Sequence, residues 1–269
     1  MKHGNNYKEI FTKESMEKRG QITIFIIVAI LIVVVGIIIY FFRVDIGAFI
    51  SGEVVPSTFI GECIEPTVLE GIKSLSEQGG YANPEGFILY GGKKIKYLCY
   101  TSEYYRTCMV QQPLIIEHFE KELGEIINKK ADECIAELKE IYESKGYGVS
   151  GMSETKTNVE IIPEKIRVTV ESPLIVTKET TQTFNEYRKE IPGSMYDLLM
   201  IATSIIDYES TYGDAAVDLY YDYYPNLIIE KNKLGDGSTI YVVRDVITKD
   251  KFTFASRSIA WPGGIGLEA

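Results

Sequence analysis

Histidine is scarce in this sequence, whose 269 residues include only His3 and His118. Nucleophilic catalysis by a serine or cysteine usually needs a nearby base that titrates near neutral pH, so this scarcity removes most such mechanisms. There is also no histidine cluster for zinc, and the phosphate-binding pattern Gly-x4-Gly-Lys-Ser/Thr is absent. We therefore predict no catalytic, cofactor or metal site, and we interpret His118 as a half-buried structural residue of a helix.

Charge and proline are missing from residues 22–42. At about 1.5 Å per residue, a helix over this run would reach roughly 30 Å, the thickness of the hydrocarbon core of a bilayer. Every face of the run is apolar, which argues against a buried core helix, and its length argues against a removable secretory signal. The sequence therefore predicts a transmembrane helix over 21–42, in which residues 22–42 contact the lipid bilayer.

Basic residues are concentrated before the apolar run. They are Lys2, Lys8, Lys13, Lys18 and Arg19, whereas only Arg43 follows the run closely. Because basic segments cross membranes poorly, residues 1–20 are expected to stay cytoplasmic as a basic leader, and the rest of the chain is expected outside. We thus predict a single-pass protein of the cell membrane with a cytoplasmic N-terminus and an extracellular C-terminal domain.

Cysteine is absent before position 63, and the four cysteines are Cys63, Cys99, Cys108 and Cys134. None belongs to a close C-x2-C pair typical of zinc sites, and an even number on the extracellular side suits disulfide bonds. Three pairings are possible. We favour Cys63–Cys134, which would join two predicted helices, together with Cys99–Cys108, which would close a short loop. A Cys63–Cys99 bond is the alternative that would contradict this choice.

Negative charge predominates, because 28 Lys and Arg stand against 38 Asp and Glu, for a net charge of −10. Such a surface repels phosphate backbones, so we expect no nucleic-acid partner. It also disfavours docking onto anionic lipid. The simplest interpretation is that the acidity keeps an extracellular domain soluble.

Hydrophobic spacing divides the chain after the apolar run. The predicted regions are a stalk at 43–56, a helical, cysteine-containing subregion at 57–146, a β-rich subregion with one helix at 147–260, and a flexible tail at 261–269. Helices are predicted over 57–78, 113–144 and 195–208, the second with a break near Asn128. Strands are predicted over 87–90, 94–100, 158–162, 165–170, 174–176, 180–191, 226–231, 239–245 and 251–260. The sequence thus predicts an α+β ectodomain, with two disulfide-pinned helices and a mostly antiparallel sheet, behind one N-terminal transmembrane helix.

The junction before the apolar run reads Lys18-Arg19-Gly20-Gln21. It resembles the archaeal class III signal peptide of type IV pilin-like proteins, in which a membrane peptidase cuts after the glycine. The resemblance implies a processing site between Gly20 and Gln21. It departs from the pilin pattern at Phe25, where such proteins usually carry a glutamate that helps subunits dock. A plain basic flank that only sets topology explains the same residues.

The whole arrangement also resembles a group of uncharacterised single-pass archaeal surface proteins. The shared features are the basic leader and anchor, a cysteine-bearing helix that ends in Gln78-Gly79-Gly80-Tyr81, a second cysteine-bearing helix and a β-rich region. The resemblance implies membrane placement and the Cys63–Cys134 pairing. It brings no known activity.

One acidic stretch is rich in tyrosine, and its carboxylates are Asp207, Glu209, Asp214, Asp218 and Asp222. Paired carboxylates beside aromatic rings suit a glycosidase or a calcium site, although the loop pattern D-x-[DN]-x-[DN]-G is missing. A solvent-facing acidic segment is the simpler interpretation, because glycosidase acids converge from distant segments. The candidate contact surface in this stretch consists of Tyr220, Tyr221, Tyr223 and Tyr224.

These observations favour a membrane-anchored extracellular protein with a structural or adhesive role and no enzymatic activity. A minor pilin-like surface component is one alternative, and its partners would be other surface proteins or pilin-like subunits. An extracytoplasmic hydrolase that uses carboxylates is the other alternative.

Overall fold

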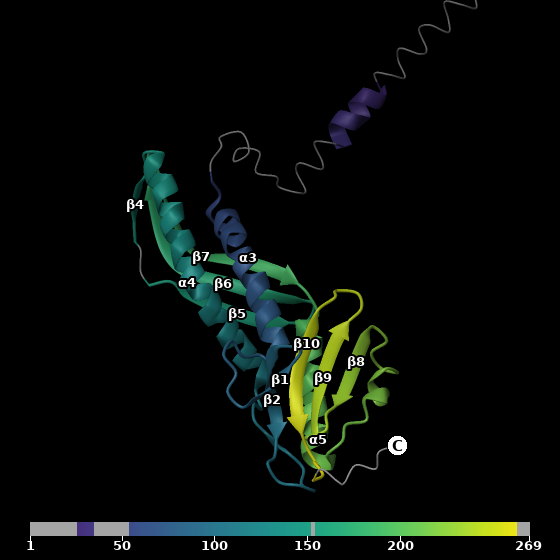
Figure 1. Ribbon diagram of the computed structural model, residues 1–269. Coiled ribbons are helices and arrows are strands. Elements are labelled where there is room, and N and C mark those ends of the chain that lie inside the picture. The colour runs from purple at the N-terminus through teal and green to yellow at the C-terminus, as the bar shows by residue number, and fades with distance from the viewer. Residues whose placement is uncertain (1–25, 35–53, 152–153, 263–269) are drawn as a thin grey trace, which may run out of the picture. The chain divides into compact units, whose positions relative to one another are not determined.

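The computed structural model describes residues 26–34, 54–151 and 154–262 (Figure 1). The chain forms two units, Met1–Val54 and Val55–Ala269. In the first unit, residues 26–34 are helical. Among the described residues, no helix combines the length and the apolar character that crossing a membrane requires. The predicted transmembrane helix over 21–42 extends beyond the described residues on both sides, and the leader, the Gly20–Gln21 junction and most of the stalk lie outside them.

The second unit mixes helices and strands along the chain. Its helices are α3 (Pro56–Glu77), α4 (Ile115–Ser144) and α5 (Met195–Tyr212), with a turn of 3-10 helix, η1 (Val217–Tyr220). Its strands are β1 (Phe87–Tyr90), β2 (Lys93–Tyr100), β3 (Met109–Val110), β4 (Gly148–Ser150), β5 (Lys156–Ile162), β6 (Lys165–Thr177), β7 (Thr181–Pro192), β8 (Leu227–Lys233), β9 (Ser238–Asp245) and β10 (Lys251–Arg257). The predicted α+β fold with mostly antiparallel sheets is confirmed.

Helices α3 and α4 pack side by side, and a disulfide between Cys63 and Cys134 joins them. The Cα atoms of the two cysteines lie 6.0 Å apart, which confirms the predicted pairing. Helix α3 begins at Pro56, whose fixed φ suits the first helical position and whose missing N–H is not needed there. The joined helices form one layer of the second unit.

The predicted break near Asn128 is wrong, since α4 is continuous over 30 residues. Its buried stripe runs without interruption through Leu123, Ile127 and Ala131, so tertiary packing supports the helix across position 128. An asparagine in a helix interior costs at most about 0.7 kcal/mol relative to alanine. Packing of the stripe outweighs that local preference.

The larger sheet has the strand order β1-β2-β10-β9-β8, and β3 pairs with β2. Its strand pairings are antiparallel except that β2 and β10 run parallel. Helix α5 lies behind this sheet in Figure 1 and packs against β9 and β10. The β8–β9 hairpin turns through Gly235-Asp236-Gly237, between the strands predicted over 226–231 and 239–245, and Gly237 adopts a φ of 87° there.

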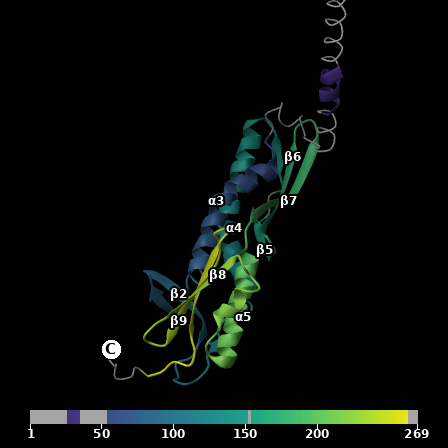
Figure 2. The ribbon, with the colours of Figure 1, turned by 90° about the vertical axis from the view of Figure 1, so that its right-hand side faces the viewer.

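The smaller sheet is built on β6, which pairs with β7 along one side and with β5 and β4 along the other. Helices α3 and α4 lie along one face of it (Figures 1 and 2). Partly exposed ion pairs join the strands. Nη1 of Arg167 lies 3.0 Å from a carboxylate oxygen of Glu160, and its Nε lies 3.1 Å from a carboxylate oxygen of Glu190. Such exposed ion pairs contribute little to stability, so the sheet is stabilised mainly by its buried face, which packs against the helices.

The sequence Gln78-Gly79-Gly80-Tyr81 forms the exit from α3. Gly79 and Gly80 have φ values of 73° and 86°, a region that other residues rarely adopt. A Cβ on Gly79 would lie 2.8 Å from the Cβ of Lys96 in β2. The two glycines therefore let the chain turn closely against β2.

Candidate contact surface

The loop after β2 is closed by a disulfide between Cys99 and Cys108, whose Cα atoms lie 5.4 Å apart. This confirms the second predicted pairing. Because β2 and β10 run parallel, their carboxyl ends point the same way, and the segments that follow them leave the sheet side by side. Residues 101–108 and 258–262 therefore meet at one end of the second unit, at the bottom of Figure 1.

Two of the residues that join these segments have strained backbones. The N–H of Tyr105 donates to the carbonyl of Ala260 at 3.0 Å, and the N–H of Ile259 donates to the carbonyl of Arg106 at 2.7 Å. Tyr105 has a φ of 57° and Ile259 a φ of 43°. A left-handed conformation costs a bulky or β-branched residue about 1–3 kcal/mol, and such strain tends to gather at functional sites. The two segments thus hold each other in a conformation that neither would prefer alone.

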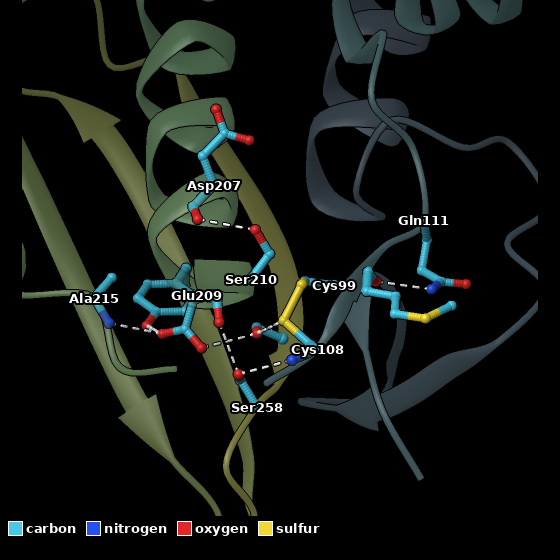
Figure 3. The surroundings of a disulfide bond; sticks show 11 residues. Cys99, Cys108, Gln111, Asp207, Glu209, Ser210, Ala215 and Ser258 are labelled. Carbon is cyan, nitrogen blue, oxygen red and sulfur yellow. Dashed lines mark hydrogen bonds between the residues drawn. A yellow bond between two sulfur atoms is a disulfide. The ribbon is translucent and has the colours of Figure 1, made fainter. Parts of the chain in front are cut away.

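Ser258 connects the disulfide loop to α5. Its Oγ accepts a hydrogen bond from the N–H of Cys108 at 3.0 Å and donates one to the main-chain carbonyl of Glu209 at 2.8 Å. Figure 3 shows Ser258 between the disulfide and the last turns of α5. The loop is therefore braced by a covalent bond and by the helix behind it.

The side chain of Glu209 lies in the core beneath this end of the molecule, with only 2% of its surface exposed. It accepts hydrogen bonds from the N–H of Ala215 at 2.9 Å, from the hydroxyl of Ser256 at 3.1 Å and from the hydroxyl of Tyr241. Burial, followed by the neighbouring Glu209 carboxylate, raises the pKa of Tyr241 well above its usual range, so this hydroxyl remains a donor. Glu209 thereby ties α5 to β9 and β10.

Three aromatic side chains project from the braced segments, and we call Tyr104, Tyr105 and Trp261 the aromatic tip. Tyr105 is 60% exposed and Trp261 is 68% exposed. Their rings meet edge to face, with centroids 5.4 Å apart. The guanidinium of Arg257 lies 5.4 Å from the centroid of the Tyr104 ring. The tip is therefore an exposed aromatic surface on a rigid support.

A groove of about 480 Å³ adjoins Trp261, between the end of α5 and the β8–β9 turn. Two glycines allow the segment after β10 to lie in this position. A Cβ on Gly213 would lie 2.1 Å from Cδ1 of Ile259, and a Cβ on Gly237 would lie 2.5 Å from the Cβ of Ala260. Trp261 forms part of the groove lining, so the groove and the aromatic tip are one continuous surface.

Asp214 and Lys233 line the same groove. One carboxylate oxygen of Asp214 lies 2.5 Å from the Nζ of Lys231, and the other lies 2.9 Å from the Nζ of Lys233. Burial alone would raise the pKa of Asp214, but the hydrogen bonds from the two lysines outweigh it and lower the pKa. The carboxylate therefore stays ionised and held in place.

No family model, curated protein or solved structure matches this chain. Of the five carboxylates of the acidic stretch, Glu209 is buried in the core, whereas Asp207, Asp218 and Asp222 are exposed. Within residues 26–34, 54–151 and 154–262, no group of three or more His, Cys, Asp or Glu is placed to hold a metal ion.

The tyrosines of the predicted contact surface lie at η1 and in the loop before β8. Tyr223 is 80% exposed, whereas the hydroxyl of Tyr220 lies 2.7 Å from that of Ser204 on α5. The hydroxyl of Tyr221 donates to the carbonyl of Ile229 at 3.0 Å, on the edge strand β8. Two of the four tyrosines thus help to hold their own segment against the fold, and Tyr223 and Tyr224 remain for contact.

The aromatic tip did not emerge from the sequence. The sequence predicts a flexible tail from Trp261 onward, of which residues 261 and 262 are described and 263–269 lie outside the described residues. Tyr104 and Tyr105 lie between the predicted strand over 94–100 and the predicted helix over 113–144, where the sequence predicts no regular element. Two features of the sequence could have indicated the aromatic tip: the two cysteines that bracket Tyr104 and Tyr105, and the position of the single tryptophan.

His118 lies on α4 against Tyr81, with ring centroids 4.0 Å apart, as expected for a half-buried structural histidine. Its Nε2 is buried and has no hydrogen-bond partner among the described residues, since the nearest carboxylate oxygen of Glu122 is 3.9 Å away. Burial lowers the pKa of His118, while Glu122 opposes that shift and Lys121 and Lys96 reinforce it. The folded protein therefore favours neutral His118.

Mild acid is expected to destabilise the fold through His118. Above the ordinary histidine pKa of 6.5, the residue is neutral in both states and its contribution to stability is complete. As pH falls below that value, the unfolded chain binds the proton first, and stability is lost down to the lower folded pKa. Urea unfolding at pH 7.5 and pH 5.0 should show this loss in the wild type and a smaller loss in His118→Phe, which keeps a ring beside Tyr81. An equal loss in both proteins would contradict the assignment to His118.

Proposed function

We propose that this protein is a single-pass membrane protein that uses an extracellular, disulfide-stabilised α+β domain to bind a surface partner, without catalysis. The apolar run over 22–42 supports membrane anchoring. The two disulfides support an oxidising compartment for the domain. Binding is assigned to the aromatic tip, which is a more specific surface than the tyrosines around η1.

The observation that supports this proposal most directly is the strained backbone of the two segments that hold the exposed rings of the aromatic tip. Folding gains little from Tyr105 and Trp261, because most of each side chain stays in water. The strain at Tyr105 and Ile259 is nevertheless retained, and a disulfide and hydrogen bonds to a buried scaffold support it. Aromatic side chains that are already rigid lose little entropy on binding, which is why tyrosine and tryptophan dominate binding hot spots.

The tip lies far from the point at which the second unit joins the preceding chain. Helix α3 begins the second unit, and at about 1.5 Å per residue its 22 residues span about 33 Å. Within the second unit, both views place the start of α3 and the loop that follows β10, which carries Trp261, at opposite ends (Figures 1 and 2). A chain tethered before Pro56 would therefore hold the tip away from its tether.

A minor pilin-like role is the second candidate, and the junction Lys18-Arg19-Gly20-Gln21 is the observation that favours it. This role requires lateral packing of the apolar helix with other subunits. N-terminal sequencing of membrane-purified protein separates a plain anchor from pilin-type processing. Chains that begin at Gln21 in sheared filaments would favour the pilin-like role, and their absence from filaments would count against it.

Removal of two of the tip rings is expected to weaken partner binding strongly. Full-length protein in nanodiscs would be sedimented with isolated envelopes of the cells that produce it. The double variant Tyr105→Ser/Trp261→Ser should bind at least tenfold more weakly, a loss of about 1.4 kcal/mol or more. The control is Tyr223→Ser, which removes an exposed ring from the η1 surface and should bind normally. A loss confined to Tyr223→Ser would move the binding site to η1, and normal binding by both variants would contradict the proposal.

A further inference from the structure

We infer that the groove beside Trp261 binds an uncharged carbohydrate, an inference that rests on the proposed binding function and names its ligand class. The groove lining includes an aromatic wall, formed by Trp261, and a polar wall, formed by the ion pair of Asp214 and Lys233. Its volume of about 480 Å³ lies within the range of small-ligand sites. The aromatic wall matches the apolar face of a sugar ring, and the polar wall matches the hydroxyl groups around its rim.

The aromatic wall suits the apolar face of a pyranose. A sugar ring presents C–H groups on its faces and hydroxyl groups around its rim, so it stacks on flat aromatic surfaces. Trp261 is the largest such surface in the chain, and it stays mostly exposed while the preceding Ala260 is buried. The edge-to-face contact with Tyr105 limits rotation of the indole ring. The platform is therefore already formed before a ligand arrives.

The polar wall suits the hydroxyl rim. Asp214 supplies acceptor oxygens, and the Nζ of Lys233 supplies donors next to them, at 2.9 Å. Adjacent sugar hydroxyls can donate to such a carboxylate and accept from such an ammonium at the same time. Gly235 also lines the groove, and a Cβ there would meet nothing within 4 Å, so the backbone at this position is open to a ligand.

The charge of the lining selects an uncharged ligand. Asp214 and Lys233 carry opposite charges, and they are the only ionisable side chains among the described residues that line the groove. The lining is therefore neutral, and the whole chain carries a net charge of −10. A strongly anionic ligand would be repelled by the chain, and a strongly cationic ligand would find no excess of carboxylates in the groove.

Intrinsic fluorescence provides a direct test, because Trp261 is the only tryptophan in the chain. Full-length protein in a detergent without a sugar headgroup would be titrated to 10 mM with neutral trisaccharides of glucose, mannose and N-acetylglucosamine. At least one trisaccharide should change Trp261 emission saturably and protect it from acrylamide quenching. Asp214→Asn and Lys233→Gln should each weaken the apparent affinity at least tenfold. Asp222→Asn, an exposed carboxylate outside the groove lining, is the matched control and should leave it unchanged.

Two results would overturn the inference. One is the absence of any saturable response to the three trisaccharides, and the other is a response only to an uncharged tetrapeptide, which would make the ligand a peptide. If either occurs while Tyr105→Ser/Trp261→Ser still loses envelope binding, the proposed binding function stands and only the ligand class is wrong. If envelope binding is also normal in that variant, both are wrong.

Discussion

Replacing Cys63 and Cys134 together with alanine is expected to lower the free energy of unfolding by about 4–5 kcal/mol. The bond closes a loop with a sequence separation of 71, so its removal restores a large conformational freedom to the unfolded chain. It also releases the contact between α3 and α4, which form the layer over the smaller sheet. Urea unfolding followed by circular dichroism would measure the loss.

The matched control for this change is the double variant Cys99→Ala/Cys108→Ala. Its loop has a sequence separation of only 9, so the expected loss is about 2–3 kcal/mol. This second variant should, however, weaken envelope binding, because the disulfide braces the aromatic tip. Equal losses of stability in the two variants would show that loop length does not decide the effect.

Replacing Glu209 with alanine is expected to cost about 3–5 kcal/mol of stability. The change leaves the buried donors of Tyr241, Ser256 and Ala215 without their acceptor and opens a cavity between α5 and the larger sheet. A buried donor left without its acceptor costs about 1–3 kcal/mol, although three that share one carboxyl group do not add independently. Thermal and urea unfolding would both report the loss.

Asp207→Ala is the control for Glu209. Asp207 lies on the same helix but is exposed, so its replacement should change stability by less than about 0.5 kcal/mol. The two residues looked alike in the acidic stretch. Similar losses for both variants would contradict the structural role assigned to the buried carboxylate.

Local patterns anticipated much of the fold. The Cys63–Cys134 bond was predictable because both cysteines lie on apolar stripes of helices, and such stripes face each other when helices pack. The hairpin turns at Pro163-Glu164 and Gly235-Asp236-Gly237 were predictable because turn residues separate two alternating runs. The false break near Asn128 shows the limit of this reasoning, since a weak local preference yielded to packing.

The candidate site depended on pairings that no local pattern reveals. Tyr105 and Trp261 lie far apart in the sequence, and they meet because β2 and β10 pair in parallel. Likewise, nothing in the acidic stretch distinguished Glu209 from Asp207. Their separation into a buried and an exposed carboxylate follows from which face of α5 packs on the sheet.

The sequence by itself determined the apolar run, the acidic balance and the α+β class. Each of these depends on composition or on spacing within one segment. Only the tertiary structure decided the order of the strands, the burial of Glu209 and the meeting of the tip rings beside the groove. Those features depend on contacts between segments distant in the chain, and such contacts form because the packing of the whole domain stabilises them together, not because any one segment prefers them.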